Sequence, residues 1–141
     1  LTKAFTSGFT VDVKNLKALS MFTNNSLQGA IKLNGNISAM GSKVSLKANS
    51  KSLGGNLKVN YKNNSLKAVF KNLNITKVLY LLKQPNYLKK GFLVGHINLN
   101  SLNPINGIYD IKANGIVNSA VVKKLHNINL GRDLKYELKT K

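Results

Sequence analysis

The fold is set by the stretch Lys43-Val44-Ser45-Leu46-Lys47-Ala48-Asn49, in which apolar residues alternate with lysine, serine and asparagine. A period of two is typical of a strand that is buried on one face only. The alternation returns in residues 56–62 and 66–71, and Gly54-Gly55 and Asn63-Asn64 stand between the three segments. Because Gly and Asn accept the positive φ of tight hairpins, the pattern predicts an antiparallel meander with a lysine face and an aliphatic face.

The same alternation extends toward both ends of the chain. It is visible in residues 9–13, 27–37, 109–114 and 134–139. The denser apolar run in residues 116–122 indicates a strand or turn that is covered on both sides. In all, nine to eleven strands are expected.

Two helices are expected between these strands. After Asn15, a residue suited to capping, Leu16, Leu19 and Phe22 follow at the spacing of a short helix. The residues from Ile75 to Leu82 have the i, i+3, i+4, i+7 apolar spacing of a longer amphipathic helix. The predicted fold is therefore mainly β, an antiparallel meander curled into an open trough with one or two short covering helices. A closed β-sandwich or barrel remains the alternative.

Composition limits the possible partners. The 141 residues have a net charge of +18, from 22 basic and 4 acidic residues, and every basic residue except Arg132 is lysine. Such a charge attracts anionic surfaces, either lipid headgroups or, less readily, nucleic acid, because base readout relies on arginine. A solvated basic face in a chain rich in Lys and Asn is the other interpretation. The absence of cysteine excludes disulfides and thiolate metal sites within the chain.

The chain is expected to be one β-rich segment, residues 1–141, of a longer protein, because it begins at Leu1 without an apolar leader. Residues 9–37 and 66–99 form a weak internal repeat. Each copy has strands, an Asn-Leu corner, a helix and a glycine-containing strand. A repeat of this kind favours a stacked architecture with flanking repeats of the same chain on either side.

An enzyme is the class of protein that the sequence supports least. Its acidic residues are scattered, and neither histidine has a carboxylate at ligand spacing, so no catalytic residue, metal or cofactor is expected. Most aromatic residues share the parity of the aliphatic ones, which argues against an exposed base-stacking platform and makes nucleic acid an unlikely partner. The residues concerned are the acids Asp12, Asp110, Asp133 and Glu137, the histidines His96 and His126, and the aromatics Phe9, Tyr61, Phe70, Tyr109 and Tyr136.

Three stretches of the chain point to a family. They are Val13-Lys14-Asn15-Leu16 leading to residues 27–33, the helix end Leu81-Leu82-Lys83-Gln84-Pro85 before residues 87–91, and Tyr109-Asp110-Ile111-Lys112-Ala113-Asn114-Gly115. In this combination they resemble the AsmA/TamB-like family of bacterial envelope proteins. The resemblance covers most of the chain and consists of β-repeat patterning, without an invariant signature.

The resemblance implies a cellular location and a function for the chain. Members of that family are similar to bridge-like lipid-transfer proteins: they are anchored in the inner membrane, extend through the periplasm and form a β-taco whose apolar inside carries acyl chains. This chain would then be a periplasmic segment that holds phospholipid moving between the inner and outer membranes and contributes to outer-membrane biogenesis or homeostasis, with a possible envelope assembly partner. By parity, the lipid-facing residues would be Val11, Val13, Ile31, Leu33, Leu46, Leu57, Val59, Leu66, Phe70, Ile97, Leu99 and Ile111.

Overall fold

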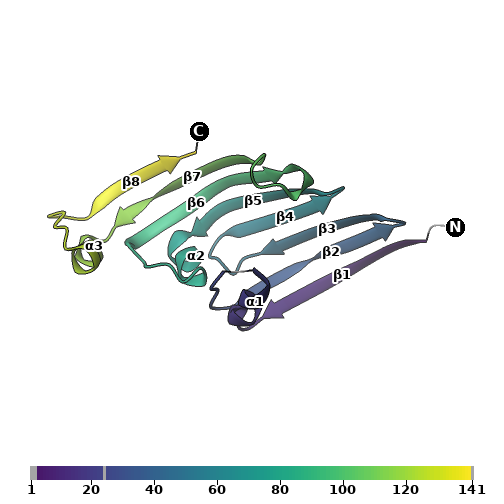
Figure 1. The fold of residues 1–141 in the computed structure, drawn as a ribbon, viewed down its shortest axis with the longest axis horizontal. Helices are drawn as coiled ribbons and strands as arrows, with labels where there is room; N and C mark the ends of the chain where they lie inside the picture. Colours follow the sequence, from purple (N-terminus) through teal and green to yellow (C-terminus); the bar gives the residue numbers. More distant parts are fainter. Residues whose placement is uncertain (1–2, 24, 141) are drawn as a thin grey trace.

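The structure is a computed structural model that describes residues 3–23 and 25–140, without the side chains of Phe22 and Thr23. Eight strands form one antiparallel sheet in which every strand pairs with the next along the chain (Figure 1). The strands are β1 (Ala4–Val13), β2 (Ile31–Met40), β3 (Lys43–Ser50), β4 (Asn56–Lys62), β5 (Ser65–Asn74), β6 (Leu88–Leu99), β7 (Ile108–Val117) and β8 (Leu134–Lys139). The predicted open meander is confirmed. The sheet does not close into a barrel, because β1 and β8 lie at its opposite edges, and it has eight strands where nine to eleven were expected.

The helical segments all connect neighbouring strands. They are η1 (Leu16–Leu19) and α1 (Ser20–Thr23) after β1, α2 (Ile75–Leu81) after β5, η2 (Asn100–Leu102) after β6 and α3 (Ser119–His126) after β7. In a meander, alternate connections fall on opposite sides of the sheet. Three connections, at α1, α2 and α3, therefore lie along one side together with the loop at residues 51–55, and we call this side the helix rim. Short turns and η2 occupy the other side, the turn rim.

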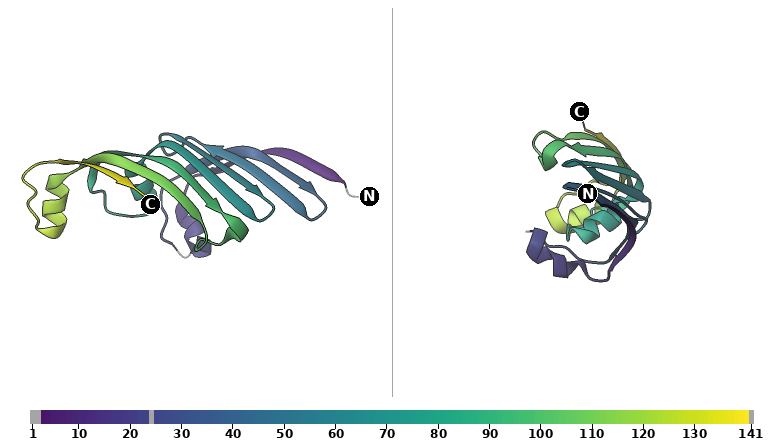
Figure 2. Two further views of the ribbon diagram at one scale, coloured as in Figure 1. Left: turned by 90° about the horizontal axis from the view of Figure 1, so that it is seen from above. Right: turned by 90° about the vertical axis from the view of Figure 1, so that its right-hand side faces the viewer.

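The sheet is curved, and α1, α2 and α3 lie on its concave side near one rim (Figure 2). The apolar face is the concave one. A Cβ added at Gly91 would lie 3.2 Å from Ile75 Cδ1 of α2, and Gly91 has the same parity in β6 as Leu93 and Ile97. The helices therefore cover part of the aliphatic face and leave the lysine face open to solvent.

Local sequence explains the two expected helices and the tightest turn. Asn15 caps η1 by accepting a hydrogen bond from the Lys17 amide, and Asn74 caps α2 by accepting from the Thr76 and Lys77 amides. Asn63 and Asn64 have φ values of 50° and 62° between β4 and β5, the left-handed geometry of a two-residue hairpin. The side chain of Phe22, expected on the first helix, lies outside the described part of the structure.

The expectation for residues 116–122 was wrong in part. β7 ends at Val117, and α3 begins at Ser119, where the Asn118 side chain accepts hydrogen bonds from the Ala120 and Val121 amides. The β-branched Val121 and Val122 suggested a strand, but the capping asparagine and tertiary contacts of the helix override that weak propensity. The chain thus has a third helix-bearing connection on the helix rim.

The buried core is small for a chain of this length. The buried apolar side chains are Leu16, Ala48, Phe70, Leu73 and Ile75, and all but Ala48 lie in or beside the β1–η1 and β5–α2 junctions of the helix rim. The accessible surface is 10088 Å², whereas a compact protein of this mass exposes about 7,200 Å². An excess of about 40% means that no second layer covers most of the sheet within the described chain.

Candidate functional site

The concave face of the sheet is the candidate site, and we call it the trough. Cross-strand pairing shows which residues share it, because directly paired residues point to the same side. The ladder of pairs Val11–Leu33, Leu57–Phe70 and Leu66–Leu99 crosses the sheet. The same registers place all twelve residues expected to face lipid on this one face: Val11, Val13, Ile31, Leu33, Leu46, Leu57, Val59, Leu66, Phe70, Ile97, Leu99 and Ile111.

The predicted lysine face is also present on the central strands. Ser45, Asn60 and Lys67 follow the opposite parity to Leu46, Val59 and Leu66. The six central lysines are all exposed on the convex side: Lys43, Lys47, Lys58, Lys62, Lys67 and Lys71. Farther along the sheet this division is less strict, since Phe92 and Val94 of β6 also point outward and are 41% and 38% exposed. Residues 92–94 are a continuous apolar run, so alternation does not distinguish the two faces of the sheet at this point.

The trough is long enough for an extended apolar ligand. Eight strands spaced by about 4.8 Å make it about 34 Å long across the strands. Most of its side chains are half-buried, while Phe5, Val11 and Leu138 on the edge strands are 56%, 42% and 64% exposed. The trough is therefore continuous, apolar and open at both ends of the described sheet.

Glycines opposite aromatic rings shape the trough. Phe9 pairs with Gly35, Phe70 with Gly95, and Tyr136 with Gly115. A Cβ at Gly35 would lie 2.8 Å from Phe9 Cζ and 2.0 Å from the Lys47 carbonyl oxygen, so a side chain here would push the strands apart. Glycine lets each ring lie against the backbone of the neighbouring strand, which is a recognised way to bend and stabilise a sheet.

The helix rim is a ledge in which backbone hydrogen bonds join the other connections to the segment around α2. The Gln28 amide donates to the Leu81 carbonyl at 2.9 Å, the Asn74 amide to Leu53 at 2.8 Å, and the Asn118 amide to Tyr87 at 2.7 Å. Each bond joins segments that are far apart in the sequence. The ledge thus fixes α2 between its neighbours and leaves the rest of the trough uncovered.

The α2 helix covers the sheet as predicted, although less completely at its end. Ile75 is buried, Val78 and Leu79 are half-buried, and Leu82, just beyond the helix, is 41% exposed. Next to Ile75, the Tyr136 hydroxyl is buried against Gly91 and Gly115 and has no hydrogen-bond partner in the described structure. Burial raises the pKa of this hydroxyl. The Tyr136 hydroxyl is accordingly shielded from water beside the helix rim.

Asp133 attaches α3 to the sheet. Its carboxylate forms an ion pair with Lys89 and accepts hydrogen bonds from the Ser119 amide at 2.9 Å and the Ser119 hydroxyl at 3.0 Å. The bond with Lys89, followed by those from Ser119, lowers the pKa of Asp133 from 3.8 to about 2. His126, at the other end of α3, stacks on Tyr87 with ring centroids 5.6 Å apart.

A test in acid follows from the Asp133 pKa. Since the folded pKa is depressed, the stabilising contribution of this carboxylate is complete above about pH 4 and is lost as the pH falls toward about 2. We expect the amide-exchange protection factors of α3 to drop within that window, as measured by hydrogen exchange with NMR. The Asp133→Asn variant should show low protection in α3 at pH 5 and little further change on acidification. Equal protection of α3 at pH 5 and at pH 2 in the unsubstituted chain would contradict the assignment.

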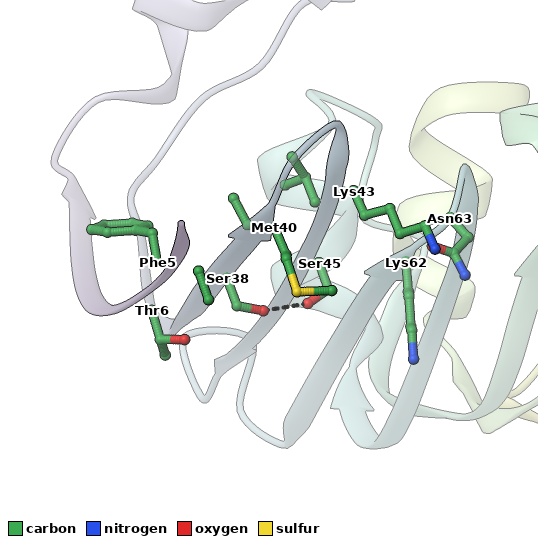
Figure 3. A pocket seen from close by; sticks show the side chains of 11 residues that line it. Phe5, Thr6, Ser38, Met40, Lys43, Ser45, Lys62 and Asn63 are labelled. Atoms are coloured by element: carbon green, nitrogen blue, oxygen red, sulfur yellow. Dashed lines mark hydrogen bonds between the residues drawn. The ribbon is translucent and has the colours of Figure 1, made fainter. Parts of the chain in front are cut away.

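The sheet also has several open hollows. One, of about 480 Å³, is at the turn rim between β1 and β4 (Figure 3). There the Ser38 and Ser45 hydroxyls are 2.6 Å apart and bond to each other, beside Lys43 and Lys62. The pair is mutually satisfied and no acid or histidine borders the hollow, so it offers no catalytic arrangement.

Titratable groups do not form a centre of another kind in the described ranges. His96 Nδ1 and an Asp110 carboxylate oxygen are 3.9 Å apart on the convex face, where both side chains are exposed. In residues 3–23 and 25–140 there is no group of three or more His, Asp or Glu side chains that could hold a metal ion. Over the same residues, the helices are all too short or too polar to cross a membrane.

The fold and the site define a class: an open, singly curved antiparallel β-trough with an apolar inside and a basic outside. Comparisons with protein-family models, curated proteins and solved structures found no match to this chain.

Proposed function

We propose that the chain is a segment of a bridge-like lipid-transport protein and that the trough holds the acyl chains of phospholipid. The observation that carries the proposal is an apolar concave face that runs across all eight strands and is covered by helices only along one rim. Covering each of its large side chains with hydrocarbon would gain up to about 1.5–3 kcal/mol. A large exposed apolar surface on a protein commonly marks a binding site.

The dimensions of the trough fit this ligand. The hydrocarbon core of a bilayer is about 30 Å thick and contains two layers of acyl chains, so one chain spans about 15 Å. A chain whose headgroup lies at the turn rim would lie along the strands, which at about 3.3 Å per residue are longer than about 15 Å, and the roughly 34 Å across the strands would hold several such chains side by side. The polar headgroups would extend past the turn rim into water, because the helix rim is occupied by the ledge.

The wider setting follows the resemblance to the AsmA/TamB-like family. We propose a periplasmic segment of an inner-membrane-anchored protein of the bacterial cell envelope, flanked by further repeats, that passes phospholipid between the inner and outer membranes. The strand–helix–strand arrangements within residues 9–37 and 66–99, each with an aromatic–glycine pair, support the proposed repeat. No catalytic step is needed, because apolar contacts hold the lipid without forming a covalent bond, so the lipid can leave again.

The direct test is to identify what the protein carries. The chain is purified without detergent from a bacterial host, and its ligands are measured by native mass spectrometry and by lipid analysis of an organic extract. We expect phospholipid bound at one or more molecules per chain. A folded, monomeric chain without lipid that also takes up none from vesicles would overturn the proposal. Absorbance at 260 nm exceeding that at 280 nm would instead indicate nucleic acid.

A further inference from the structure

The charges of this protein are distributed unevenly along the sheet. The acidic residues are Asp12, Asp110, Asp133 and Glu137, so residues 13–109 contain none, whereas the same span contains fourteen lysines. In the structure these acids lie on β1 and on the β7–β8 side, at the two ends of the sheet. The central strands are consequently the most positive part of the molecule.

Six lysines of these strands form one surface, which we call the lysine patch: Lys43, Lys47, Lys58, Lys62, Lys67 and Lys71. All lie on the convex face of β3, β4 and β5. The ion pairs between described residues join Lys14 to Asp12, Lys89 to Asp133, His96 to Asp110 and Lys139 to Glu137, and none includes a patch lysine. The charge of the patch is therefore uncompensated by neighbouring carboxylates.

The patch also borders an open hollow. Lys47, Lys58 and Lys67 line this hollow of about 490 Å³ together with Asn36, Asn49, Asn60 and the exposed Val69. The ammonium and side-chain amide groups of these residues are hydrogen-bond donors, which suit the phosphate oxygens of a headgroup.

We propose that the lysine patch binds the anionic phospholipid surface of a bilayer, with the convex side of the sheet toward the membrane. Lysine provides point charges for a diffuse field, without the fixed bidentate geometry of arginine that nucleic-acid readout uses. The aromatic residues of the same strands, Tyr61 and Phe70, face the trough and provide no base-stacking platform on the patch. The proposal concerns the face opposite the trough and does not depend on whether the trough holds lipid.

Vesicle binding of matched variants tests the patch. The first variant combines Lys47→Gln, Lys58→Gln and Lys67→Gln, and the control combines Lys123→Gln, Lys124→Gln and Lys135→Gln on α3 and β8. Both lower the net charge by three from +18. Binding is measured by co-sedimentation with vesicles of phosphatidylcholine containing 30% phosphatidylglycerol. Each lysine near an anionic surface contributes about fivefold, so we expect the patch variant to bind about 100-fold more weakly and the control variant about fivefold or less.

Other outcomes separate the patch from the trough and from net charge. Binding of the unsubstituted chain to the anionic vesicles should fall steeply with added salt. It should also be much weaker to vesicles of phosphatidylcholine alone, which have no net charge and so measure only apolar binding. Equal weakening of the two lysine variants, or tighter binding to single-stranded DNA than to the anionic vesicles, would overturn the proposal.

Discussion

A carboxylate placed in the trough should empty the protein of lipid. Val59 and Leu46 are half-buried on the concave face of adjacent strands, where Val59 pairs with Ala48 and Leu46 with Tyr61. In the Val59→Asp or Leu46→Asp chain, water can solvate the new charge as long as the trough is empty. Once acyl chains cover the site, the charge must lose that water, at a cost of at least about 2 kcal/mol, or roughly thirtyfold in affinity. We expect bound phospholipid to fall to background in the extraction and native mass spectrometry described above.

The matched control is Asn56→Asp. It introduces the same charge three residues before Val59 in β4, on the exposed convex face and outside the hollow of the lysine patch, and is nearly isosteric. Its side chain remains in water whether or not the trough holds lipid, so lipid content should stay close to that of the unsubstituted chain. Circular dichroism must show that the inward variants are folded. Folded inward variants with a full complement of lipid, or an equal loss in Asn56→Asp, would refute the trough as the binding site.

The sequence predicts much of this fold because a one-sided sheet is encoded by local alternation. The local pattern alone shows which side chains share a face, as in Leu57-Lys58-Val59-Asn60-Tyr61. The hairpin Asn63-Asn64 and the helix caps Asn15 and Asn74 are likewise local signals, and each is present in the structure.

Features that depend on distant residues were not predictable in the same way. The α3 helix is held by Asp133, fourteen residues beyond Ser119. Its Val121, Val122 and Leu125 do fall at helical spacing, but the segment is short and its β-branched pair favoured a strand. The closeness of Tyr136 to Gly91 and Gly115 requires three strands to be in register. The alternation indicates which residues share a face of the sheet, but not what covers that face. The function of the trough therefore has to be measured with the ligand.

The largest loss of stability is expected from truncating the most central of the buried side chains. Phe70 is 6% exposed, lies on a middle strand of the trough near the β5–α2 junction and pairs with Gly95, which has no side chain to fill a vacated space. Phe70→Ala should therefore leave a cavity and destabilise the fold by about 3–5 kcal/mol. For a domain of this size the midpoint of thermal unfolding would fall by about 10 °C or more.

Val69 provides the neighbouring control for that experiment. It follows the opposite parity, is 42% exposed on the convex face and pairs with His96. Val69→Ala should lower the free energy of unfolding by about 1 kcal/mol or less. The side chain it shortens is already partly in water, and alanine has only a modestly lower preference for strands than valine. Urea unfolding of both variants measures the difference. Because the buried core is small, we expect Phe70→Ala to be largely unfolded at 37 °C while Val69→Ala remains folded. Equal losses of stability in the two variants would show that the β5–α2 junction does not hold this sheet together.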